Sequence, residues 1–199
     1  KNTLMWIIIF GFLLRLGLGV YADLRLPNIG YNEETQKAGY LFRDAYNRDS
    51  QAWEMATSST ALNKFLTDGN AYDQYGGLII ISTFIYKFFS PLYHNVYLIL
   101  FLAALVSTIG IPFVWEMLSN TKRVQLFATL IYAFYPDSIL FSASQMREPF
   151  ILGLSAILFW LVSSGKTHQK KNILTGSIIA GLILIISAKI GIFIILLAA

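Results

Sequence analysis

Long apolar runs, separated by short polar stretches, dominate the pattern of this 199-residue chain. A helix needs about 20 apolar residues to cross the ~30 Å hydrocarbon core of a bilayer, and several of the runs approach that length. The pattern therefore predicts an all-α fold, a polytopic transmembrane helical bundle. The predicted spans are residues 4–22, 96–118, 124–147, 149–164 and 173–189, and residues 190–199 begin a further span.

One apolar segment, residues 78–89, does not fit this series. Its 12 residues would extend only about 18 Å as a helix, which is too short to cross the bilayer core. We therefore predict an interfacial or re-entrant segment. Residues 23–95 then form one long loop that carries helices on the membrane surface.

Basic residues orient the predicted bundle. Lys122 and Arg123 lie in one tight loop, and Lys166, Lys170 and Lys171 lie in another. Because cytoplasmic loops carry an excess of Lys and Arg, both loops are predicted to be cytoplasmic. Two spans separate them, which is consistent with a shared side. The long loop, residues 23–95, is then extracytoplasmic.

The composition narrows the class of protein further. The chain is 56% hydrophobic and only 13% charged, whereas soluble domains carry about 25% charged residues. Cysteine is absent, so disulfides and thiolate metal sites are excluded. The net charge of +4 gives no reason to expect a nucleic-acid partner. We interpret residues 1–199 as a single transmembrane module of a longer protein, because the chain lacks an initial Met and stops inside an apolar run.

The long loop holds the first candidate site, in the stretch RDSQAWEMA that begins at Arg48. Asp49, Trp53 and Ala56 have the i, i+4, i+7 spacing of one helical face. Trp is a common anchor at the membrane interface. Two interpretations stay open. Asp49 either caps the N-terminus of an interfacial helix or presents a reactive carboxylate.

Further candidates lie at the predicted outer boundary. The turn MREPF contains Arg147 and Glu148, and Lys189 follows an apolar run in SAKIG. Ionisable groups at membrane depth are functional candidates, because burying them in lipid is costly. Glu148 could equally be a helix N-terminal carboxylate before Pro149, which the helix dipole favours. Lys189 could equally extend its amine to the headgroups.

These motifs, in this order, resemble the membrane glycosyltransferases of the GT-C fold, which include protein O-mannosyltransferases and lipid A aminoarabinose transferases. In that family an acidic residue precedes an aromatic residue by four positions, on a helix after the first span. Asp49 and Trp53 match this pattern, and Ser50 stands where Glu is frequent. DQYGGLIIISTFIYKFFS resembles the segment that closes the first loop. MREPF resembles the outer turn with a second acidic residue, and SAKIG resembles a later Lys-Gly motif.

The resemblance implies transfer of a sugar from a polyprenyl-phosphate or polyprenyl-pyrophosphate lipid to an acceptor glycan, lipid or protein. The reaction would take place with inversion at the outer face of a bacterial or archaeal plasma membrane. Asp49 would be the catalytic base and Glu148 a second catalytic acid, and the two would hold a divalent metal ion if one takes part. The implied substrate-binding residues are Lys189, Arg147, Trp53, Asp73 and Tyr75.

A second function is a transport or polysaccharide-export membrane component without catalysis. Such a protein would carry acids and bases near the bilayer midplane, on broken helices. Eight of the eleven carboxylates lie instead in the predicted outer loop, which favours surface chemistry. A non-catalytic relative of the glycosyltransferases is a third interpretation, because of Ser50. His94 and His168 lie in separate loops, so a metal site built from them is not expected.

Overall fold

The computed structural model describes residues 2–58, 63–64, 67, 76–118, 121–164 and 170–198. Regular secondary structure in these ranges is helical, without strands, which confirms the all-α prediction. The helices are α1 (Asn2–Ile29), α2 (Glu34–Lys37), α3 (Arg43–Thr57), α5 (Gly76–Phe89), α6 (Tyr97–Met117), α7 (Lys122–Phe134), α8 (Pro136–Ala143), α9 (Glu148–Ser163), α10 (Lys170–Ile186) and α11 (Ala188–Ala198).

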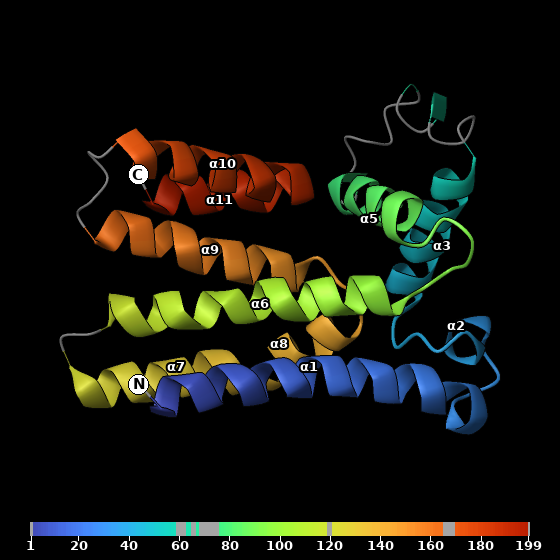
Figure 1. Cartoon of the computed structure of the whole chain (residues 1–199), viewed down its shortest axis with the longest axis horizontal. Helices are drawn as coiled ribbons and strands as arrows, with labels where there is room; N and C mark the ends of the chain where they lie inside the picture. Colours follow the sequence, from blue (N-terminus) through green and yellow to red (C-terminus); the bar gives the residue numbers. More distant parts are fainter. Residues whose placement is uncertain are drawn as a thin grey trace.

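The long helices lie side by side, and helices that follow one another along the chain run in opposite directions (Figure 1). Helix α6 packs between α1 and α9, and α10 and α11 form a hairpin against α9. The N-terminus and the beginnings of α7 and α10 lie at one end of the bundle. The other end, which we call the loop end, carries α2, α3, α5, the turn of residues 144–147 and the α10–α11 turn (Figure 1).

Three stretches are long and apolar enough to cross a membrane: Asn2–Ile29, Tyr97–Met117 and Lys122–Ala143. Helices α5, α9, α10 and α11 are apolar but shorter. The outward face of α1 displays large apolar side chains, among them Trp6, Phe10 and Leu13. Apolar side chains on the outside of a bundle suit contact with lipid, so the architecture fits a polytopic membrane protein.

Two boundaries differ from the predicted ones. Helix α1 continues to Ile29, beyond the predicted end of the first span at residue 22. A helix that extends past the membrane can carry polar side chains without losing its backbone hydrogen bonds. At the other end of the chain, α10 stops at Ile186 rather than at residue 189, and α11 then packs back against α10.

The predicted span 124–147 is divided into two helices. Helix α7 ends at Phe134, Tyr135 takes an extended ψ of 122°, and α8 begins at Pro136. The residue before a proline is sterically disfavoured in the α conformation, which explains the break. Helix α8 ends at Ala143, and Gln145 has a positive φ of 56° in the following turn.

Helix α5 contains the apolar segment that the sequence predicted not to cross. It lies at the loop end, packed on α3 and on the end of α10 (Figure 1). A Cβ atom at Gly77 would collide with the carbonyl oxygen of Ile185. Glycine therefore allows the close approach of α5 to α10 that holds this helix on the bundle.

Candidate functional site

Helix α3 carries the candidate carboxylate on its buried face. The buried positions are Ala45, Arg48, Asp49, Ala52 and Met55, with the spacing of an amphipathic helix that packs on a partner. That partner is α5. Asp49 lies well inside α3, whose N-cap residue is Phe42. The interpretation of Asp49 as a helix cap is therefore wrong.

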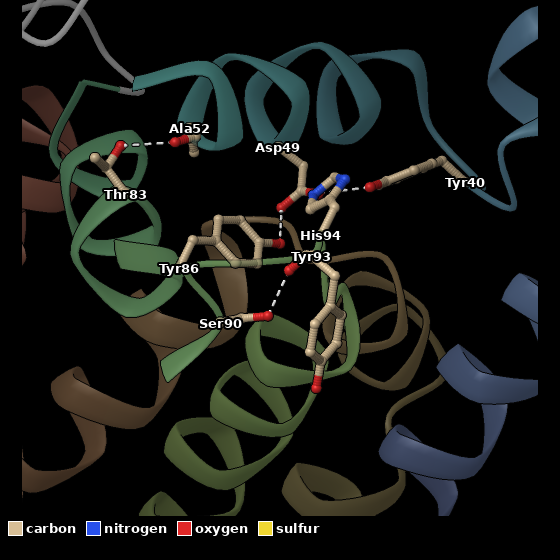
Figure 2. A network of polar contacts seen from close by, with 8 residues as sticks. All are labelled: Tyr40, Asp49, Ala52, Thr83, Tyr86, Ser90, Tyr93 and His94. Atoms are coloured by element: carbon tan, nitrogen blue, oxygen red, sulfur yellow. Dashed lines mark hydrogen bonds and ion pairs between the residues drawn. The ribbon is translucent and has the colours of Figure 1, made fainter. Parts of the chain in front are cut away.

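The Asp49 carboxylate accepts hydrogen bonds from three side chains (Figure 2). The Tyr40 hydroxyl donates to Oδ2 at 2.5 Å, and the Tyr86 hydroxyl donates to Oδ1 at 2.5 Å. His94 Nε2 lies 2.7 Å from Oδ2. Tyr40 precedes α3, Tyr86 belongs to α5 and His94 precedes α6, so three separate segments converge on one carboxylate.

Both tyrosines remain proton donors in this network. Burial raises the pKa of Tyr40 and of Tyr86 far above the usual range, and the nearby Asp49 charge raises each pKa further. Hydrogen bonds to a charged acceptor are about twice as strong as those between neutral groups. The two phenols therefore fix the Asp49 carboxylate in place.

His94 is the most accessible member of the network. Its side chain is 28% exposed, whereas that of Asp49 is 3% exposed. The Trp53 ring stacks on the imidazole at 5.1 Å between centroids, and the Tyr86 ring meets its edge at 5.0 Å. Trp53 is thus a half-buried packing partner of His94 on the predicted face of α3.

Sequence reasoning considered His94 only as a metal ligand and did not connect it with Asp49. The two residues are separated by 45 positions, so no helical period relates them. The available signal was topological, because His94 lies at the end of the same predicted outer loop as Asp49. A histidine in the same loop as the motif carboxylate can be brought close to it by the fold, so His94 was a candidate acid–base partner of Asp49.

Glu148 and Arg147 begin α9, and Arg147 Nε donates to Glu148 Oε1 at 3.3 Å. Glu148 is in the first turn and precedes Pro149, which suits its interpretation as a helix N-terminal carboxylate. Glu148 Oε2 is buried and accepts no hydrogen bond from the described residues.

Two mostly apolar cavities border Glu148. A cavity of about 210 Å³ lies between α8 and α9 and is lined by Tyr135, Asp137, Ser138, Phe141, Glu148, Pro149 and Leu152. A second cavity of about 350 Å³ lies between α9 and α11 and is lined by Glu148, Ile151, Leu152, Ser155, Phe159, Ile190, Ile194 and Leu197. Asp49 lines neither cavity.

The Asp49 motif and the MREPF turn are nevertheless neighbours. Arg48, next to Asp49, donates through Nη2 to the carbonyl oxygen of Gln145. Tyr40 and Ala45 also share an apolar cluster with Met146. The structure thus places the two motifs together at the loop end, without a direct contact between Asp49 and Glu148 in the described residues.

The remaining predicted residues have different outcomes. Lys189 is exposed near the start of α11, and its amine makes no hydrogen bond or ion pair with the residues that the structure describes. Asp73 and Tyr75 lie outside the described residues.

The predicted metal ligands do not form a matching site. Within the described ranges, no group of three or more His, Asp or Glu side chains could hold a metal ion. The two oxygens of Asp49 are occupied by three hydrogen bonds. Asp49, as it is held here, therefore does not fit the role of a metal ligand.

Arg15, in the middle of α1, is a buried charge that the sequence reasoning did not single out. It is fully buried and donates to Ser107 Oγ and Ser138 Oγ at 3.0 Å. It also donates to the carbonyl oxygens of Gly11 at 2.9 Å and Ala133 at 2.7 Å. A lone arginine in an apolar run was the available signal.

Comparisons with protein families, with curated proteins and with solved structures found no match to this chain. The arrangement that carries most chemistry is a buried carboxylate paired with a partly exposed imidazole, a combination that serves proton transfer in enzymes.

Proposed function

We propose that this protein is a membrane glycosyltransferase of the GT-C type. It transfers a sugar from a polyprenyl-phosphate lipid to an acceptor at the extracytoplasmic face. The observation that carries the proposal is the contact of His94 Nε2 with the Asp49 carboxylate at 2.7 Å, at the loop end of the bundle. The motif with Asp49 and Trp53, and its position after the first span, support the same assignment.

The reaction has one demanding proton transfer. The acceptor hydroxyl attacks the anomeric carbon, and the bond from that carbon to the phosphate oxygen breaks. A phosphate is a good leaving group, but a hydroxyl is a weak nucleophile that needs a base. The Asp49–His94 pair supplies such a base, and a single displacement inverts the anomeric carbon.

Charge develops on the departing lipid. The phosphodiester donor carries one negative charge, and the released polyprenyl phosphate approaches two. Cations stabilise such developing charge. The turn of residues 144–147, which contains Arg147, and the start of α11, which contains Lys189, lie at the loop end (Figure 1), and Lys189 is exposed. Lys189 and Arg147 are the residues proposed to bind the phosphate.

The lipid chain is proposed to occupy an apolar groove of the bundle. The cavity of about 350 Å³ between α9 and α11 is lined by aliphatic and aromatic side chains, including Ile151, Phe159 and Ile194. It borders Glu148 and Ile190, next to the two proposed phosphate ligands in sequence. A polyprenyl chain would bury apolar surface there while its phosphate stays at the loop end.

A transport or polysaccharide-export component is the second candidate, and two observations favour it. The α7–α8 helix is interrupted at Tyr135, and Arg15 is buried in the bundle next to this break. Interrupted helices are common at transporter binding sites. However, Arg15 is fully buried and engaged by four hydrogen bonds, so it is not open to a transported solute.

The test is a transfer assay with the purified full-length protein. The donors are radiolabelled polyprenyl-phosphate mannose, glucose and aminoarabinose, offered with envelope lipids and glycans as acceptors. We expect release of polyprenyl phosphate together with labelled product. Asp49→Asn should lower the rate roughly 100-fold, the scale of lost acid–base catalysis. Asp44→Asn is the matched control, because Asp44 is exposed on the same helix.

Two results would contradict the proposal. Failure of the wild-type protein to transfer any of the three sugars would remove the glycosyltransferase assignment for these donors. Equal rates for wild type and Asp49→Asn would leave Asp49 with a structural role only. Movement of an unmodified polyprenyl-linked glycan across the membrane of proteoliposomes, without transfer of its sugar to an acceptor, would favour the transport component instead.

A further inference from the structure

We infer that His94, rather than Asp49, receives the proton of the acceptor hydroxyl, and that Asp49 is a positioning residue for His94. This inference rests on the proposed glycosyltransferase function. It changes the predicted role of Asp49 and adds a catalytic residue that the sequence motif does not contain.

Asp49 and His94 differ in their access to solvent. The Asp49 side chain is 3% exposed, and its two oxygens accept three hydrogen bonds. An acceptor sugar could reach this carboxylate only by displacing Tyr40, Tyr86 or His94. The His94 side chain is 28% exposed, so an acceptor hydroxyl can approach it without breaking the network.

The contact with Asp49 also selects which nitrogen of the His94 ring carries the proton. In neutral imidazole one nitrogen donates and the other accepts. An ionised carboxylate only accepts, so the contact with Asp49 places the proton on Nε2. The lone pair is then on Nδ1. Nδ1 has no hydrogen bond with the described residues and is not among the buried polar atoms without a partner.

Asp49 and Trp53 both stabilise the protonated His94 ring. After the transfer, the imidazolium lies 2.7 Å from the Asp49 carboxylate and faces the Trp53 ring at 5.1 Å. Opposite charge and an aromatic face both stabilise a cation. Among the described residues, the other titratable groups around this pair are Tyr86, whose ring contacts the His94 ring, and Tyr40, which donates to the same Asp49 oxygen, Oδ2, that His94 contacts (Figure 2). Because both phenols stay protonated, neither can accept the transferred proton. Both also keep their hydrogen bonds to Asp49.

The step balances without a further reagent. A bond forms between the acceptor oxygen and the anomeric carbon, and the bond from that carbon to the phosphate oxygen breaks. The electron pair leaves with polyprenyl phosphate, and the hydroxyl proton moves to His94 Nδ1. The imidazolium then releases that proton to water, which restores the neutral ring for the next turnover.

The first experiment uses the full-length protein in the transfer assay described above. His94→Gln should lower the rate roughly 100-fold while leaving binding of polyprenyl phosphate unchanged. Added imidazole should partly restore the activity of His94→Ala, because it can occupy the vacated space, but not that of Asp49→Asn. The matched control is His168→Gln at the only other histidine in the sequence, which should retain full activity.

The second experiment tests the positioning role of Asp49 without activity. In the ¹⁵N-histidine-labelled full-length protein, the His94 imidazole signal is identified by its loss in His94→Gln. Its ¹⁵N shifts should report a proton fixed on Nε2. Asp49→Asn should convert the ring to a mixture of tautomers, because a neutral amide no longer selects one nitrogen. A proton fixed on Nδ1 in the protein with native Asp49 would overturn the inference.

The two proposals fail in different ways. If wild type transfers sugar and His94→Gln is equally active, the inference is overturned while the glycosyltransferase assignment stands. If imidazole leaves His94→Ala inactive and lipid binding is also lost, His94 is structural and the inference again fails. If the wild-type protein transfers no sugar, both the proposed function and this inference are contradicted.

Discussion

The guanidinium of Arg15 donates a hydrogen bond of 2.7 Å to the carbonyl oxygen of Ala133, near the end of α7. The last carbonyls of a helix have no partner within the helix, and α7 ends at Phe134 because Pro136 follows Tyr135. Arg15 therefore satisfies a carbonyl near the break and, through Ser138, also holds the start of α8. The cation is favourably placed beside the negative end of the α7 dipole.

The first prediction concerns this contact. Arg15→Lys keeps the charge but replaces a forked donor with one ammonium group, which cannot reach all four acceptors. Leaving buried acceptors without partners costs about 1–3 kcal/mol, which should lower the melting temperature by roughly 2–12 °C. Thermal unfolding of the detergent-solubilised protein measures this shift. Arg25→Lys, at an exposed position of α1, should change the melting temperature little. Equal effects of Arg15→Lys and Arg25→Lys would show that the hydrogen bonds of Arg15 do not stabilise the break between α7 and α8.

The second prediction is loss of stability at alkaline pH. The pKa values of Tyr40 and Tyr86 are raised in the folded protein, first by burial and then by Asp49. Above about pH 10 the unfolded chain loses these phenolic protons while the folded protein keeps them. The free energy of unfolding should therefore fall as the pH rises, by up to about 1.4 kcal/mol per pH unit for each tyrosine.

Melting temperatures between about pH 8 and about pH 11 test this sign. In the double variant Tyr40→Phe and Tyr86→Phe, stability should depend less steeply on pH in the alkaline range. Tyr93→Phe is the control, because Tyr93 is exposed. A double variant with the same alkaline slope as the wild type would show that other groups cause the effect.

The third prediction is the orientation in the membrane. The chain contains no cysteine, so single cysteines can be introduced and labelled cleanly. Exposed positions at the loop end include Lys37 and Ala188, and Thr121 is an exposed position at the opposite end. An impermeant maleimide added to intact cells should label Lys37→Cys and Ala188→Cys but not Thr121→Cys. The reverse labelling pattern would place the Asp49 network in the cytoplasm.

The fourth prediction concerns the lipid phosphate. Lys189→Gln removes the exposed charge at the start of α11 and should weaken binding of polyprenyl phosphate about tenfold, or roughly 1.4 kcal/mol. Arg147→Gln should act in the same direction, because a guanidinium matches a phosphate group well. The control is Lys87→Gln, which removes another exposed lysine near the loop end, on α5. Unchanged affinity in both test variants would remove the proposed phosphate site.

Much of the architecture could be predicted because it depends on local patterns. Helices follow from the length and period of the apolar runs, and α3 follows from the spacing of Asp49, Trp53 and Ala56. The predicted span 124–147 is not one continuous helix, and this also has a local cause, because Pro136 interrupts it. The pattern of apolar residues by itself does not show this break. Residues 78–89 belong to α5, an apolar helix of 14 residues, and that this segment does not cross the membrane stays a prediction.

The candidate site depended more strongly on tertiary structure. The sequence by itself determined that Asp49 and Trp53 share a helix. It also determined that Glu148 precedes one apolar run and that Lys189 follows another. Only the packing of α3 on α5 brings Tyr86 to Asp49, and only the return of the chain before α6 brings His94 there. Arg15 likewise meets Ser107 and Ser138 through the packing of α1 on α6 and α8. Hydrophobic period specifies which face of a helix is buried, whereas the choice of opposing side chains depends on how whole helices cross and how far each is shifted along its neighbour.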